Sequence, residues 1–192
     1  MNNKKILLTV FIVVALVQLA VPAKMIWDKE RVLELGKEFK FETAPIDPTD
    51  PFRGKYIVLQ YKENRVAIDS KSDWEEGQSV YVHLITDRNG FAKIGSVSKE
   101  KPTGTEDFVK AKVEFIGDIG YTTMNIAYPF DRFYMEESKA FEAEQQYIKS
   151  QIDSTKITYA LVNIRDGESV LKDVLIDGVS ISEIVKKNRL EE

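Results

Sequence analysis

The chain has no cysteine and a single histidine, His83. Without cysteine there is neither a disulfide framework nor a thiolate metal site. One histidine removes most zinc sites and argues against a catalytic triad built on histidine. The net charge of -4 argues against a DNA- or RNA-binding surface, which needs a positive field. We therefore expect no cofactor, no metal and no nucleic-acid partner.

The remaining composition is that of a globular protein, with 43% apolar and 30% charged residues. A length of 192 residues fits one domain of ordinary size plus an N-terminal segment.

A long apolar run stands at the front of the chain, from Ile6 to Val21, behind Lys4 and Lys5. A signal peptide has this layout, and the small residues that follow Val21 supply a loose cleavage site. A membrane anchor needs about 20 apolar residues, which the run reaches if it continues to Trp27 at the membrane interface. The segment after Trp27 still has a helical pattern, so we expect the uncleaved anchor and keep cleavage as the alternative.

This interpretation divides the chain into three parts: a signal-anchor helix (1–27), a juxtamembrane helix or linker (28–42) with Gly36 as a helix stop, and a β-rich domain (43–192). The basic tip predicts a single-pass protein of the cytoplasmic membrane with its N-terminus inside. The domain would then be extracytoplasmic, on the periplasmic side.

Alternation with a period of two dominates the rest of the chain and predicts strands. We expect them at 55–61, 66–69, 80–86, 91–97, 109–116, 121–128, 157–164 and 170–176, with hairpin turns at 87–90, 117–120 and 166–167. Residues 136–152 predict a helix with Phe141, Tyr147 and Ile148 on its apolar face, and 181–190 a short terminal one. The predicted fold is α+β: a mainly antiparallel sheet or partly open barrel with one packed helix, behind the N-terminal transmembrane helix.

The stretch TAPIDPTDPFRGKYIVLQY, residues 43–61, resembles the defining segment of the GDYXXLXY family of bacterial membrane-anchored proteins. The matching positions are Pro45, Asp47, Pro48, Asp50, Arg53, Gly54, Tyr56, Leu59 and Tyr61. Lys55 stands where the family has the Asp of its name. Further blocks near residues 80 and 140 and near the end of the chain also resemble the family. The resemblance implies an N-terminal membrane helix and a multi-pass membrane protein as companion; it implies no activity.

The acidic loop has two interpretations. Asp47 and Asp50 with Arg53 and Glu63 could bind a hard cation or work as acid and base. The simpler interpretation is turn chemistry, because Asp before Pro initiates turns. Lys55 supports it, since an Asp-to-Lys exchange would abolish any carboxylate chemistry at that position.

Other candidates have plain structural interpretations. Gly54 is expected to need a positive φ or a close backbone approach. Tyr56, Leu59 and Tyr61 are expected in the core and on the sheet face, with an aromatic peptide groove as the alternative. His83 is expected to be a solvent-facing or hydrogen-bonded strand residue.

Glu136 and Glu137 fit the N-terminal end of a helix dipole, and a catalytic carboxylate pair is the alternative. A signal-peptidase-like enzyme needs a serine soon after the anchor, and none occurs between Lys24 and Asp69.

The expected function is therefore non-enzymatic: a membrane-anchored domain that binds a multi-pass membrane protein. Thr9 and Gln18 offer polar contacts inside the membrane helix. A hydrolase using Asp47, Asp50, Arg53 and Glu137 is one alternative, and a secreted binding module is another. The oligomeric state is left open.

Overall fold

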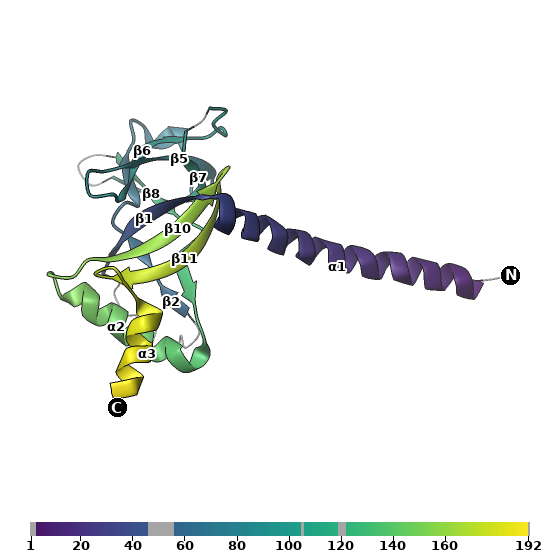
Figure 1. Ribbon diagram of the computed structural model, residues 1–192. Helices are drawn as coiled ribbons and strands as arrows, with labels where there is room; N and C mark the ends of the chain where they lie inside the picture. The colour runs from purple at the N-terminus through teal and green to yellow at the C-terminus, as the bar shows by residue number, and fades with distance from the viewer. Residues whose placement is uncertain (1–2, 46–55, 105, 119–121, 192) are drawn as a thin grey trace.

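The structure, a computed structural model, describes residues 3–45, 56–104, 106–118 and 122–191 (Figure 1). Within these ranges the helical elements are α1 (Asn3–Leu35), the 3-10 turn η1 (Lys71–Asp73), α2 (Glu137–Ile152) and α3 (Ile181–Glu191). The predicted fold class is confirmed, because an apolar N-terminal helix precedes a domain of mostly antiparallel strands.

The helix α1 is unbroken over 33 residues and projects away from the rest of the chain (Figure 1). At 1.5 Å per residue it is about 50 Å long. Its stretch Ile6–Leu35 is long and apolar enough to cross a membrane, and the large apolar side chains from Ile6 to Trp27 are exposed. Pro22 lies inside the helix without ending it.

The predicted stop at Gly36 is confirmed: α1 ends at Leu35, and the Gly36 N–H donates to the Val32 carbonyl over 2.9 Å. Of the segment expected as helix or linker, 28–42, only the part up to Leu35 is helical, as the end of α1. Residues Lys37–Ala44 form the strand β1 instead. Phe39 and Phe41 turn inward from β1 and are buried, so this strand belongs to the core.

The strands of the described residues form two five-stranded sheets and one separate pair. The first sheet has the order β12–β11–β10–β1–β3, with β3 (Gln60–Tyr61), β10 (Thr158–Arg165), β11 (Glu168–Ile176) and β12 (Val179–Ser180) beside β1. The second has the order β4–β8–β7–β5–β6, made of β4 (Arg65–Ala67), β8 (Thr122–Ala127), β7 (Phe108–Asp118), β5 (Ser79–Thr86) and β6 (Ala92–Ser98). The pair consists of β2 (Tyr56–Val58) and β9 (Arg132–Tyr134).

Two local contacts join the five-stranded sheets into a nearly closed barrel. On one side Lys40 of β1 bridges to Phe91, next to β6. On the other side the turn between β10 and β11 meets β7: Val109 bridges to Gly167, and the Lys110 N–H donates to the Gly167 carbonyl over 2.9 Å. The inward side chains of both sheets fill the space between them as one continuous core.

The helices α2 and α3 lie side by side (Figure 1). The helix α2 covers the core with a face of small side chains, because Ala140, Ala143 and Ser150 are buried together with Tyr147. Phe141, which was expected on this face, is 65% exposed. The helix was therefore predicted correctly and Tyr147 faces the core as expected, but the placement of Phe141 was wrong.

Candidate binding surface on the motif strand

The motif segment, predicted as one strand, is divided between β2 and β3, but its side chains alternate as the sequence predicts. Ile57, Leu59 and Tyr61 point inward and are at most 3% exposed. Tyr56 and Val58 point the other way and are partly exposed. Every second residue of a strand faces the same side of the sheet, so one segment contributes both to the core and to a surface.

The inward half of the motif is held by an aromatic cluster. The ring of Tyr61 packs edge-on against Phe41, Tyr128 and Phe130, with ring centroids 5.3 to 5.8 Å apart. The Tyr61 hydroxyl donates to the Phe130 carbonyl over 2.7 Å, which satisfies its polar atom inside the core. Burial raises the pKa of Tyr61 well above its ordinary value, so the phenol stays neutral. These residues therefore build the fold.

The outward half of the motif forms a small aromatic and cationic face on the β2–β9 pair. Tyr56 lies opposite Tyr134, and their ring centroids are 5.3 Å apart. The guanidinium of Arg132 lies over the Tyr56 ring, 5.0 Å from its centroid. Tyr134 is 65% exposed. Since Tyr and Arg are enriched at protein interfaces, we name Tyr56, Arg132 and Tyr134 the motif face and treat it as a candidate binding surface.

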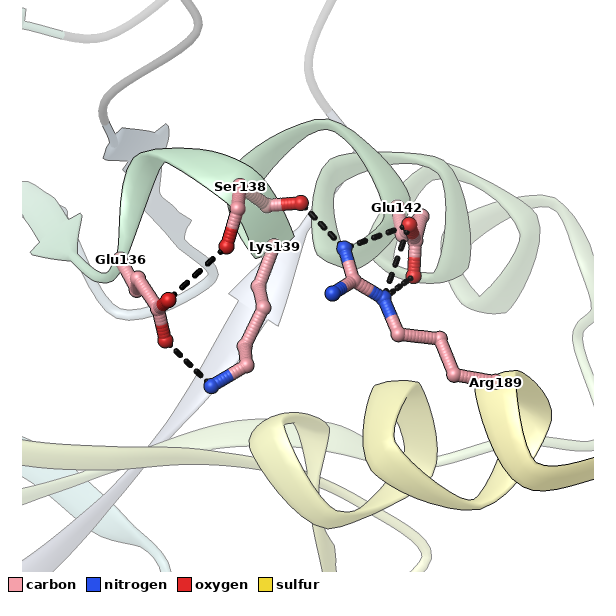
Figure 2. Close-up of polar contacts among 5 residues, drawn as sticks. All are labelled: Glu136, Ser138, Lys139, Glu142 and Arg189. Atoms are coloured by element: carbon pink, nitrogen blue, oxygen red, sulfur yellow. Dashed lines mark hydrogen bonds and ion pairs between the residues drawn. The ribbon is translucent and has the colours of Figure 1, made fainter.

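The start of α2 is occupied by local polar contacts (Figure 2). Lys139 pairs with Glu136, and the Ser138 hydroxyl donates to the same carboxylate over 3.0 Å. These contacts lower the pKa of Glu136, the Lys139 hydrogen bond most. Glu137 lies in the first turn of α2, where a negative charge complements the helix dipole. This geometry fits the helix-start interpretation of the two glutamates.

Arg189 joins α3 to α2 (Figure 2). Its Nε and Nη2 atoms both donate to the Glu142 carboxylate, over 2.8 and 2.7 Å, and Nη2 also donates to the Ser138 carbonyl. The hydrogen bonds from Arg189 are the main reason that the pKa of Glu142 is lowered. A planar guanidinium suits such a paired contact, so the C-terminal helix has a fixed place on the domain.

The junction between α1 and the barrel is a feature that sequence analysis missed. The Asn163 side chain of β10 donates to the Leu33 carbonyl over 2.7 Å, satisfying a group that a helix end leaves unpaired. Val32 is buried against the sheet, and Lys29 pairs with Glu168 of β11 over 2.8 Å. At Gly36 a Cβ atom would overlap the Val32 carbonyl oxygen. The last two turns of α1 are therefore packed on the domain.

A family model, described as GDYXXLXY protein, matches residues 18–174 and so covers most of the chain. The chain belongs to the GDYXXLXY family. No curated protein and no solved structure matches it. The matched range begins within α1 and includes the helix–barrel junction, β2, β3 and β9.

Several GDYXXLXY motif positions lie outside the described residues: Asp47, Pro48, Asp50, Arg53, Gly54 and the divergent Lys55. Pro45 is the exposed residue that follows β1. Of the hydrolase set, only Glu137 is described, so the predicted acidic cluster stays a prediction. Glu63, the fourth member of the cation hypothesis, pairs with Lys93. Among the described residues no group of three or more His, Asp or Glu side chains could hold a metal.

His83 has the hydrogen-bonded strand position that was expected. Its Nδ1 atom lies 2.8 Å from the Glu106 carboxylate, and its side chain is 17% exposed. The imidazole therefore links β5 to the segment that leads into β7.

Proposed function

We propose that this GDYXXLXY protein is a single-pass membrane protein whose barrel domain acts without catalysis, as an extracytoplasmic binding subunit of a multi-pass membrane protein. The observation that carries the proposal is the unbroken path of α1 from the apolar run into its packed contact with β10 and β11.

This junction differs from a flexible tether. A tether of Gly and Ser would let the domain move freely relative to the membrane. Here Val32 is buried and the Leu33 carbonyl accepts a hydrogen bond from Asn163, so the end of α1 is part of the folded domain. A rigid link of this kind is useful when a domain must meet a partner at a fixed height and angle, because it removes the entropy cost of orienting the domain on binding.

Two surfaces support a partner in the membrane. The first is the apolar run of α1, in which Gln18 is an exposed polar side chain. One hydrogen bond of this kind is worth only about 0.6–2 kcal/mol inside a bilayer, so the helix alone would bind weakly. The second is the motif face, which would add a contact outside the membrane. Because the apolar run of α1 and the motif face belong to one protein, binding of the first surface raises the effective concentration of the second at the partner.

The orientation follows from charge. Lys4 and Lys5 precede the apolar run, and positive residues stay on the cytoplasmic side. The barrel at the other end of α1 would then lie outside the cytoplasm. A periplasmic-type reporter fused after Leu190 should be active, and activity of a cytoplasmic reporter instead would contradict the orientation.

The test is co-purification of the full chain from mild detergent, followed by identification of the proteins recovered. Exchange of Arg132 and Tyr134 for Ala should reduce recovery of a multi-pass partner several-fold, and exchange of Gln18 for Leu should reduce it less. The control variant is Lys149→Ala, a surface change at the far end of α2. Recovery that is unchanged in the Arg132/Tyr134 variant would exclude the motif face, and recovery of no membrane protein by the wild type would refute the proposal.

A further inference from the structure

A notch interrupts the barrel wall beside the end of α1. The strand β8 leaves β7 after Ala127, and the β10–β11 turn joins β7 at Gly167, so a stretch of β7 lies between two diverging neighbours. A cavity of about 410 Å³ lies there, with Lys110 and Lys112 of β7 in its wall. Lys29 of α1 also lines it. We call this cavity, with its three lysines, the basic notch.

The charge of the basic notch is unbalanced. Lys29 pairs with Glu168 over 2.8 Å, which leaves the charges of Lys110 and Lys112. Both lysines are exposed and alternate with the buried Val109 and Ala111, so their side chains lie on the outer face of β7. Within the described part of the chain no carboxylate forms an ion pair with either of them. The hydroxyl groups of Ser79 and Ser169 add hydrogen-bonding capacity to the wall.

The position of Lys29 along α1 sets the level of the basic notch relative to the membrane surface. Lys29 follows Trp27, the last apolar residue of the helix before the charged stretch, by two residues. Two residues of helix rise about 3 Å, which keeps Lys29 within the headgroup layer if Trp27 lies at the interface. This step rests on the membrane anchorage of the proposed function.

We propose that the basic notch binds the phosphate-bearing headgroup of an anionic phospholipid in the leaflet from which α1 emerges. Ammonium groups of lysine bind phosphate as point charges, and basic residues near a membrane surface attract anionic lipids. The junction places Lys29 on the same cavity as the two lysines of β7, so the three basic residues are brought together before the lipid arrives. The ligand is a bilayer lipid rather than free phosphate, because at headgroup depth lipid phosphates are far more concentrated than dissolved phosphate.

Trp27 provides a local probe. The chain has two tryptophans, so a Trp74→Phe background leaves Trp27 as the only one. The full chain is placed in mixed vesicles of phosphatidylcholine and phosphatidylglycerol, with bromine on the acyl chains of one lipid at a time. Bromine quenches a nearby indole, so the ratio of the two quenching efficiencies reports which lipid collects beside Trp27.

The expected ratio favours phosphatidylglycerol by up to about thirtyfold, because each of the two unpaired lysines near an anionic surface contributes about fivefold. Lys110→Ala/Lys112→Ala should bring the ratio to about one, whereas Lys149→Ala/Lys156→Ala, a pair of equal charge on and beyond the end of α2, should leave it unchanged. Glu168→Gln should raise it, because Lys29 loses its ion-pair partner. These are exposed side chains, so all variants should keep the wild-type melting temperature.

Each other outcome overturns a defined step. Equal quenching by both lipids in the wild type would refute binding of an anionic lipid in the basic notch, but it would still agree with insertion of α1 into the membrane. Quenching by neither lipid would show that Trp27 does not lie in the membrane interface, and it would refute both the membrane anchorage of α1 and lipid binding in the basic notch. Loss of the preference on addition of millimolar inorganic phosphate, but not of sodium chloride at equal ionic strength, would show that the notch takes free phosphate and would refute the lipid. A control pair as damaging as Lys110→Ala/Lys112→Ala would reduce the effect to overall charge.

Discussion

Replacement of Gly167 by alanine tests how the barrel closes. Gly167 and Asp166 form the two-residue turn between β10 and β11, and both have positive φ, 89° and 53°. This is the backbone of a type I′ turn, which favours glycine. A Cβ atom on Gly167 would lie 2.7 Å from the Phe108 ring, which is 7% exposed. The substitution therefore strains the backbone and also wedges the turn away from β7.

The two effects can be separated with Gly90 as a matched position. Gly90 has a φ of 85°, but an added Cβ there meets nothing within 4 Å. Each alanine should cost about 1–2 kcal/mol for its left-handed backbone. Gly167→Ala should cost about 1–3 kcal/mol more, the usual penalty for overpacking a core. For a domain of this size that difference lowers the melting temperature by about a further 2–12 °C.

The assay is thermal and denaturant unfolding of the full chain in mild detergent, followed by the fluorescence of Trp74 in a Trp27→Phe background. A second test uses Phe108→Leu, which removes the ring edge: in that background Gly167→Ala should cost no more than Gly90→Ala. Equal destabilisation by the two glycine variants in the wild-type background would refute the reasoning. It would mean that the Phe108 ring moves aside and that the β10–β11 turn does not press on β7.

Three further predictions follow from the same structure. Burial raises the pKa of Tyr147 to about 12, above the ordinary value near 10. The contribution of the neutral phenol to the free energy of unfolding is therefore complete below pH 10 and is lost as the pH rises to about 12. The free energy of unfolding should fall less steeply with alkaline pH in Tyr147→Phe, and an unchanged pH profile would contradict the burial effect. Gly36→Ala should lower the melting temperature more than Gly104→Ala, because an added Cβ overlaps backbone only at Gly36; similar melting curves would show that the α1 junction can shift. The full chain should resist alkaline carbonate extraction and keep Met1 to Ala23, whereas a soluble product that begins near Lys24 would establish signal-peptide cleavage.

Strands rich in β-branched residues were predictable from sequence, and a strand rich in charged residues was not. The β5–β6 and β10–β11 hairpins contain β-branched strands, β5, β10 and β11, and turn residues, and both formed as expected. β1 was missed because its segment KEFKFETA holds two phenylalanines among charges and follows directly on a helical pattern. A second Asp-Gly pair, Asp177–Gly178, makes the β11–β12 turn with the same positive φ angles as Asp166–Gly167, and the same signal would have found it.

The outer face of α2 shows where hydrophobicity alone misleads. Phe141 was expected to face the core, but Ala140 and Ala143 do so, and they let the helix approach the sheet closely. The buried side is also held by hydrogen bonds: Thr158 donates to Ser150 over 2.8 Å. Close packing and paired polar groups fix the rotation of a helix as much as its largest apolar side chains do. Such pairs depend on which strand lies opposite, which one sequence does not reveal.

The candidate surfaces depend on the same kind of non-local information. That Tyr56 faces outward was readable from alternation, but its neighbours Arg132 and Tyr134 come from a strand more than 70 positions later. The basic notch joins β7 to a lysine of α1, and only the packed helix end brings them together.

The rigid junction also limits how the two candidate surfaces can act. From Trp27 to Leu35 the helix rises about 12 Å, which carries the chain just past one headgroup layer of about 5–8 Å. An anchored barrel would therefore rest close to the membrane, with the basic notch at the level of the lipid phosphates. Because Val32 and the Leu33 carbonyl are fixed to the sheet, a partner that tilts or rotates α1 moves the motif face by the same rotation. A signal that begins inside the bilayer would thus reach the motif face without any change within the barrel.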